Sequence, residues 1–279
     1  MNLPTTVLRP VVFCAALFLP YLSLAQEQPA AVAPATAEPA AVVPVKDPAA
    51  MEVIMKMADF LSRAPKFSVT IRSGYDAVQD SGQKIEFGET RAVTVKRPDR
   101  FRSETERNDG DKGLTVFNGK DILVYNETEN FFALESKPGT IDQAINHFVK
   151  DLQMHMPLAM LYMSTLPAEL DKRILETSIV EETVSGKDVY DHVAARTQAV
   201  DIQVWVDQGK NPLPRRVVLT YKDEEGQPQF WAEFTRWNMN PKVDESKFTF
   251  TPPKDAERIQ FVSQVRRPKG GAEQSEVSQ

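Results

Sequence analysis

The chain has 279 residues, a formal net charge of −6 and an isoelectric point near 5.3. This mild acidity gives no sign of the clustered basic face that nucleic-acid binding requires. The only cysteine of the sequence, Cys14, lies in the apolar N-terminal segment. The rest of the chain therefore has no disulfide, thiol nucleophile or thiolate metal site, and a hydrophobic core has to stabilise it.

Residues 1–25 have the pattern of a cleaved secretory signal peptide. Residues 11–19 form its apolar stretch, and Ala25 ends a run that suits cleavage directly after it. A retained membrane anchor is the alternative, but a spanning helix needs about 20 apolar residues and Pro20 interrupts this run. Phe13 stands where a lipoprotein signal has a small residue before its cysteine. We therefore expect an exported, periplasmic protein without a transmembrane anchor.

Residues 26–46 are dominated by alanine, proline and valine, which predicts an extended linker. This linker is either a dispensable tether or a spacer that holds the domain away from a partner. The folded domain is expected over residues 47–263, because Asp47 and Pro48 are residue types that start helices. Apolar residues then recur at helical spacing up to position 63. Residues 264–279 are polar and predicted to be a disordered tail.

Strands are predicted from Phe67 onward, where the apolar period changes from helical spacing to two. About ten or eleven consecutive strands follow, and Asn118-Gly119 is typical of a two-residue hairpin turn. Helical spacing returns only in the centre of the chain, over about 140–152 and 157–165. After Pro167 the strands are expected to resume, and the last short strand is expected around Phe248.

This order of elements predicts a mainly β (α+β) fold with an antiparallel sheet, because strands and helices do not alternate and the connections are short. A sheet of ten or eleven strands has to curl or close. We therefore expect one highly curved sheet that forms an unclosed β-barrel. Its apolar concave face would be covered by the N-terminal helix and a central helical lid, and its other face would be solvated.

Catalytic and metal-binding motifs are missing from the sequence. It contains no phosphate-binding glycine loop, no G-x-S-x-G elbow and no HExxH pair. Its histidines are His147, His155 and His192; the first two are eight residues apart, which is a poor spacing for a metal pair, and the third is expected to be a partly exposed strand residue. We predict a protein that is not an enzyme and that needs no cofactor or metal.

A cluster of methionines in the central helical region suggests a ligand site. Met154, Met156, Met160 and Met163 lie close together in the sequence, and methionine adapts to varied apolar partners. The same residues could simply fill an irregular core. The predicted lining of an apolar cavity consists of lid residues and inward strand residues: Phe148, Leu152, Met156, Met160, Met163, Val69, Ile71, Val204, Val217, Leu219 and Phe234.

Five segments in a fixed order resemble a bacterial family of predicted periplasmic proteins, known as domain of unknown function 2092. They are DPAAMEVIMKMADFL, KRPDRFR, FNGKDILVY, WVDQGKNPLPRRVVLTYKDEEGQPQF and FTFTPP, and together they span about residues 47–262. The resemblance implies a fold like that of the lipoprotein-localisation carriers LolA and LolB, which bind acyl chains inside an unclosed barrel. Many members have a Cys-His-His stretch where this chain reads Tyr190-Asp191-His192, so no thiol or metal role carries over.

Together, these patterns predict a periplasmic, non-catalytic binding or carrier protein for a lipidic ligand. The ligand would be an acyl chain, a lipoprotein or a glycolipid held in an apolar cavity. The alternative is an envelope scaffold or sensor whose cavity is filled by its own side chains and whose partners are other envelope proteins. Nucleic acid is not an expected partner in either case.

Overall fold

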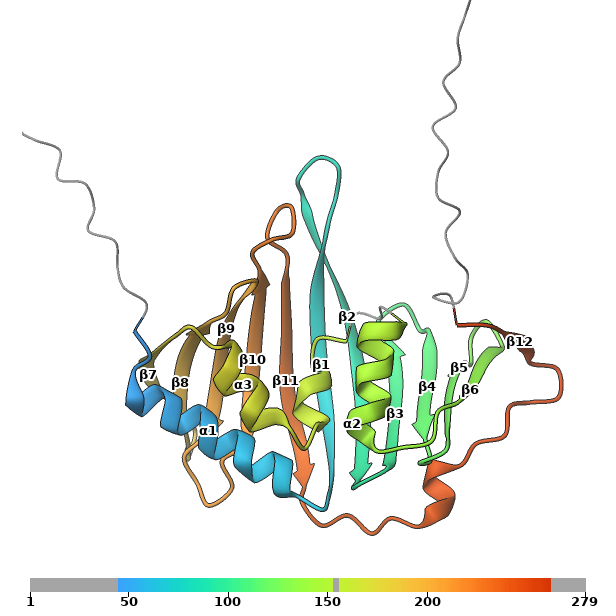
Figure 1. Ribbon diagram of the computed structural model, residues 1–279. Helices are drawn as coiled ribbons and strands as arrows, with labels where there is room; N and C mark the ends of the chain where they lie inside the picture. Colours follow the sequence, from blue (N-terminus) through green and yellow to red (C-terminus); the bar gives the residue numbers. More distant parts are fainter. Residues whose placement is uncertain (1–44, 153–155, 262–279) are drawn as a thin grey trace, which may run out of the picture. The chain divides into compact units, whose positions relative to one another are not determined.

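The computed structural model describes residues 45–152 and 156–261, which form one sheet of twelve strands with helices against one of its faces (Figure 1). The predicted signal peptide, nearly all of the linker and the tail lie outside the described residues, so their boundaries stay predictions. The expected fold class is confirmed. Neighbouring strands are antiparallel except at one edge, and the two edge strands, β7 and β12, do not pair with each other. The sheet is therefore an unclosed barrel.

The elements follow the chain in a simple order. The helices are α1 (Pro48–Arg63), α2 (Ile141–Asn146), a π-helical turn η1 (His147–Asp151), a 3₁₀ turn η2 (Ala159–Tyr162), α3 (Leu166–Arg173) and a 3₁₀ turn η3 (Glu245–Phe248). The strands are β1 (Lys66–Val78), β2 (Lys84–Lys96), β3 (Arg100–Arg107), β4 (Lys112–Phe117), β5 (Asp121–Asn126), β6 (Phe131–Ser136), β7 (Glu176–Ser185), β8 (Asp188–Arg196), β9 (Val200–Asp207), β10 (Pro214–Tyr221), β11 (Gln229–Asn238) and β12 (Glu257–Ile259).

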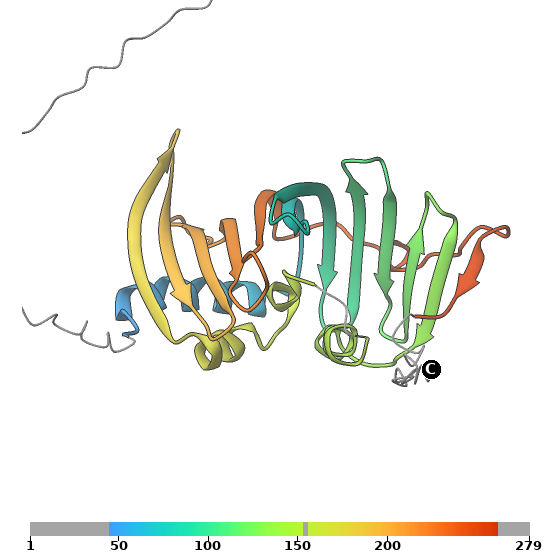
Figure 2. The same cartoon turned by 90° about the horizontal axis from the view of Figure 1, so that it is seen from above.

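The sheet has two halves that meet at the pairing of β1 with β11. The spatial order is β12-β6-β5-β4-β3-β2-β1-β11-β10-β9-β8-β7, so each half is a meander of sequential strands. Seen from above, the sheet bends so that the helices lie on one side of it (Figure 2). We call this side the concave face. Both halves contribute apolar side chains to it, because every second residue of a strand points the same way.

The helices divide the concave face between them. α1 contacts β7, β8 and β9, and α2 lies over the other half of the sheet (Figure 1). The Asp47 carboxylate accepts the N–H of Ala49, which caps α1 as expected. We call residues 141–152 and 156–173 the cover. It contains one element that the sequence reading missed, α3, because Pro167 was taken as a break whereas proline suits the first turn of a helix.

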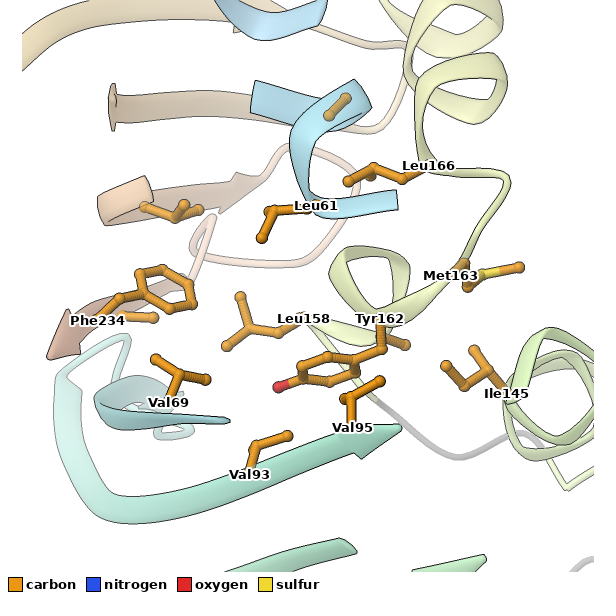
Figure 3. Close-up of a cluster of buried hydrophobic side chains, with 14 of the residues drawn as sticks. Leu61, Val69, Val93, Val95, Ile145, Leu158, Tyr162, Met163, Leu166 and Phe234 are labelled. Carbon is orange, nitrogen blue, oxygen red and sulfur yellow. The ribbon is translucent and has the colours of Figure 1, made fainter. Parts of the chain in front are cut away.

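The centre of the concave face is densely packed. Leu158 and Tyr162 of the cover point toward Val69, Val93 and Val95 of β1 and β2 (Figure 3). All five side chains are buried. Dense packing of this kind makes the centre sensitive to any change in side-chain volume.

The opposite face of β4 and β5 is buried too, which contradicts the expectation that one face of the sheet is solvated throughout. The C-terminal segment crosses this face on its way from β11 to β12 (Figure 1). Phe248 lies there at 0% exposure, against Leu114, Val116 and Leu123. The expected last strand at Phe248 is also wrong: that residue ends η3, and the last strand is β12. The C-terminal segment covers the outer face of these strands, so both of their faces are buried. The two-residue apolar period of the strands does not reveal this cover.

A ladder of aromatic and cationic side chains covers the outer face of the other half. The Trp205 ring stacks on His192 at 3.9 Å between centroids, and the Arg216 guanidinium lies over both Trp205 and Trp231. The Trp231 indole N–H donates to Glu86 at 2.8 Å. His192 is therefore buried, at 7% exposure, and the prediction of a partly exposed strand residue is wrong because Trp205 covers its ring.

Candidate ligand-binding cavity

An apolar cavity remains between the cover, α1 and strands β8 to β10. Its volume is about 350 Å³, within the usual range for small-molecule sites of about 300–1,000 Å³. Three of its lining residues, Arg173, Thr197 and Tyr221, carry polar side-chain groups. The other residues that line it are apolar: Ile54, Met57, Val149, Met156, Pro157, Leu158, Met160, Leu161, Leu166, Leu170, Ile174, Ala195, Val200, Ile202, Val204, Val217 and Leu219.

Strand register builds the floor of this cavity. Ile202 is paired with Leu219, and Val204 with Val217, so four branched side chains lie side by side on the concave face. The next strand adds Ala195, which is paired with Ile202. Because alanine is small, this row leaves room under α1 and α3. The alternating pattern of β8, β9 and β10 therefore determines which side chains form the floor.

Buried polar contacts hold the roof of the cavity in place. The Arg97 guanidinium donates to the carbonyl of Tyr162 at 2.7 Å and to the carbonyls of Leu61 and Ala64, which ties the end of α1 to the cover. Burial lowers the pKa of Arg97 below its ordinary value. On the other side of the cover, the Asp142 carboxylate accepts the N–H of Ser164 at 2.9 Å. Arg97 thus ties the cover and the end of α1 to the β2–β3 turn, and Asp142 joins the two segments of the cover to each other.

The residues that the sequence predicted to line the cavity fall into two groups in the structure. Met156, Met160, Val204, Val217 and Leu219 line the cavity. The other predicted residues do not line it. Phe148, Leu152, Met163, Val69 and Phe234 are buried in the main core, and Ile71 faces a neighbouring chamber. Met154 and His155 lie outside the described residues.

Several lining residues were missed by the sequence reading. Ile54 and Met57 come from α1, whose helical period was recognised but whose inward face was not assigned to the site. Leu170 and Ile174 come from α3 and its end, and they were missed with that helix. Ile202 comes from β9, and its place two residues before the predicted lining residue Val204 was the signal that could have assigned it to the site.

Two other hollows flank the cavity. One is an open groove of about 920 Å³ between the second half of α1 and the β9–β10 loop, and its lining mixes Lys56, Asp59, Arg63 and Lys210 with a few apolar residues. Although it is the larger hollow, its exposed charges suit solvent better than an acyl chain. The other is a polar chamber of about 410 Å³, which shares Tyr221 and two cover residues with the apolar cavity.

Two tyrosines carry polar groups at the edge of the cavity and in the neighbouring packed centre. Burial raises the pKa of Tyr221, at the boundary of the cavity and the polar chamber, to about 12. Burial likewise raises the pKa of Tyr162, a residue of the cover, to about 12. Both side chains therefore stay neutral at physiological pH, and neither is prepared for proton transfer near neutrality.

Metal ligands do not gather around this cavity. Within residues 45–152 and 156–261, no three histidine, cysteine, aspartate or glutamate side chains are placed to hold a metal ion. His147 is engaged elsewhere, with its Nδ1 at 2.6 Å from Asp151 and its Nε2 at 3.0 Å from Glu135. In the same part of the chain, no helix has the length and apolar composition needed to cross a membrane.

The fold and the cavity define a class: a single sheet, antiparallel except at the edge strand β12, bent into an open half-barrel, with helices over an apolar concave face. The chain belongs to the family described as predicted periplasmic protein (DUF2092), whose model matches residues 50–262. The family expected from the sequence and the periplasmic location are thereby confirmed. No curated protein matches the chain.

Solved structures with a similar chain course come from several bacteria. The lipoprotein LppX of Mycobacterium tuberculosis is 14% identical, with 71% of this chain and 100% of that chain covered and a TM-score of 0.45. A LolA superfamily protein of Nitrosomonas europaea is 10% identical, with 72% and 97% covered and a TM-score of 0.32. MucB of Pseudomonas aeruginosa, in its complex with MucA, is 14% identical, with 73% and 61% covered and a TM-score of 0.39.

Proposed function

We propose that the protein is a non-catalytic periplasmic binding or carrier protein for a lipidic ligand, whose acyl chain occupies the apolar cavity. The observation that carries this proposal is the cavity lining, which is aliphatic or methionine at all but three of its described positions. A hollow of this kind gains nothing from water, because water needs polar partners. An acyl chain gains contact with every wall.

Cavity size sets an expected chain length. A methylene group takes roughly the 30 Å³ that a water molecule occupies in the liquid, so 350 Å³ holds about 12 such groups. Each buried methylene contributes about 0.8 kcal/mol, which corresponds to about a fourfold gain in affinity. Affinity should therefore rise steeply with chain length and level off once the cavity is full.

A chain-length series tests this expectation. Straight-chain alcohols of increasing length would be titrated against the protein, each displacing the neutral fluorophore N-phenyl-1-naphthylamine. The proposal expects about a fourfold gain per methylene and a plateau near 12 carbons. A flat series, or one that keeps rising far beyond this length, contradicts binding inside this cavity.

A cavity-filling variant locates the binding site. Ile202→Trp places an indole in the cavity, and we expect it to weaken the binding of dodecanol at least about tenfold. Ile179→Trp is the matched control, because it makes the same substitution at an exposed position of the edge strand β7. Equal binding by both variants would place the ligand elsewhere.

A protein partner is the second candidate function, and the edge strand β7 favours it. Val180 and Val184 are 51% and 64% exposed on this strand, which pairs on one side with β8 and leaves most of its other edge open. Edge strands with exposed apolar side chains accept strands of other proteins. Native mass spectrometry of the protein from periplasmic extract separates the two: co-purified lipid supports the carrier, and a lipid-free complex with another envelope protein supports the scaffold.

A further inference from the structure

A polar chamber opens beside the apolar cavity, over the middle of the β1–β2 hairpin. Its volume is about 410 Å³, and it is lined by β1, β2, the cover and the β10–β11 connection. Pro157, Leu158 and Tyr221 line both hollows, so the two spaces adjoin on either side of these three residues. A ligand that extends past these residues would have its apolar chain in one space and its polar end in the other.

The charges of the chamber are predominantly negative. Its lining contains three carboxylates, on Asp76, Glu89 and Glu224, and one guanidinium, on Arg91, which leaves a formal charge of −2. Arg91 and Glu89 form an ion pair with each other, with side chains 27% and 19% exposed. In the described part of the chain, Asp76 and Glu224 have no ion-pair partner. Asp76 accepts one hydrogen bond, from the N–H of Gln229 at 3.0 Å.

A buried hydroxyl is also available to a ligand. Ser73 lines the chamber, is 3% exposed, and its side chain makes no hydrogen bond to any residue that the structure describes. Its oxygen is not among the fully enclosed polar atoms that lack a partner, so the hydroxyl opens into the chamber, where it can donate and accept a hydrogen bond. Ser73 is paired with Glu89 across β1 and β2, which places the hydroxyl next to the carboxylates.

We propose that the ligand is an amphiphile whose polar end carries a cationic amine, with the alkyl chain in the apolar cavity and the ammonium group in the polar chamber. This inference rests on the proposed function, since it names the class of lipid that the same site takes. An ammonium group donates three hydrogen bonds. Its positive charge would supply the ion-pair partner that the carboxylates of Asp76 and Glu224 do not have in the described part of the chain. An anionic head group is disfavoured, because Arg91 is already paired with Glu89 and the remaining charge is negative.

Three probes of equal chain length test the head-group preference. Dodecylamine, dodecanol and dodecanoic acid would each displace N-phenyl-1-naphthylamine at pH 7, below their micellar concentrations. We expect the amine to bind at least roughly tenfold more tightly than the acid, with the alcohol between them. Equal affinities of all three overturn the head-group proposal and leave the carrier function standing. Failure of all three to displace the fluorophore overturns the carrier function itself.

Charge-neutral variants show whether the chamber causes the preference. Asp76→Asn/Glu224→Gln removes both unpaired carboxylates, and we expect it to reduce the preference for amine over acid to less than about threefold while dodecanol binding stays the same. Asp244→Asn/Glu129→Gln is the matched control, because it changes the net charge equally at two exposed positions outside the chamber. The proposal fails if both double variants keep the wild-type preference.

Two natural sources can supply such an amine, an amino-bearing lipid and an acylated peptide with a free amine. Lysophosphatidylethanolamine and a palmitoylated lysine-containing peptide represent them, and each would be compared with its N-acetylated form. Loss of affinity on acetylation for one compound assigns the source and supports the proposal. Unchanged affinity for both overturns it.

Discussion

The centre and the flank of the concave face are built from similar apolar strand residues, but only the centre is filled. In the centre, Val69, Val93 and Phe234 are at most 3% exposed and meet Leu158 and Tyr162 of the cover (Figure 3). On the flank, Ile202 and Leu219 are only partly buried and face a cavity of about 350 Å³. The cover inserts an aromatic ring into the centre, whereas flexible methionines and leucines border the flank. The side chains of the cover, more than those of the sheet, therefore decide where a hollow remains.

Truncation should reveal this difference most strongly. Phe234→Ala removes a ring from the packed centre, and we expect it to lower the free energy of unfolding by about 3–5 kcal/mol. Leu219→Ala removes a side chain that already borders empty space, so its loss should be clearly smaller, at about 1–2 kcal/mol. Urea denaturation of both variants measures the contrast, and equal losses would mean that the flank is packed as tightly as the centre.

Enlarged side chains should also destabilise the packed centre more than the flank. Val93→Phe forces extra volume into the packed centre and should cost about 1–3 kcal/mol of unfolding free energy. Ile202→Phe can extend into the cavity, so we expect less than about 1 kcal/mol. The midpoints of urea unfolding compare the two, and a severe loss for Ile202→Phe would argue that the cavity does not exist in solution.

The hydroxyl of Tyr162 gives a finer test of the centre. It is buried, and it has no hydrogen-bond partner in residues 45–152 and 156–261. Tyr162→Phe keeps the ring and removes the unsatisfied group, so we expect the free energy of unfolding to stay equal or to rise by about 1 kcal/mol. A loss of stability on this substitution would show that the hydroxyl has a partner in solution.

The smallest expected effect concerns pH and the anchoring of η1. A hydrogen bond from His147, 2.6 Å away, holds the pKa of the Asp151 carboxyl below its ordinary value of 3.8. Because the folded-state pKa is the lower one, this contact stabilises the fold above the ordinary value and is lost as the pH falls through the lowered one. Asp151→Asn should therefore unfold more easily than the wild type at pH 7, and the difference should shrink as the pH falls below 3.8 and through the lowered pKa. Urea midpoints across this range provide the measurement, and a pH-independent difference would contradict this origin.

Periodicity was sufficient to predict most of the fold. The limits of α1 and the alternating pattern of strands such as β3 and β9 follow directly from spacing, since each face of a strand takes every second residue. Two long-range features escaped. The wrapping segment that buries Phe248 has no local period, and the stacking that buries His192 depends on Trp205 of the next strand.

The candidate site was predictable in kind but only partly in detail. Alternation identified Val204, Val217 and Leu219 as inward residues, and the methionine cluster pointed to Met156 and Met160. Sequence could not separate these from the other predicted residues, which the structure places in the filled core or, for Ile71, at the polar chamber, because both groups share the same pattern. Whether an inward residue meets a ring or a hollow depends on the path of the cover, and that path depends on tertiary contacts such as the hydrogen bond from Arg97 to the Tyr162 carbonyl, 65 residues away in the sequence.

Methionine methyl groups offer the most direct measurement of the central claim, that an acyl chain binds in the flank cavity. Met156 and Met160 line the cavity, Met163 lies in the filled core, and Met239 borders the open groove. In protein labelled with ¹³C at the methionine methyls, titration with dodecanol is expected to shift the NMR signals of Met156 and Met160 and to leave those of Met163 and Met239 in place. Shifts confined to Met239, or no shifts at saturating dodecanol, would contradict the account.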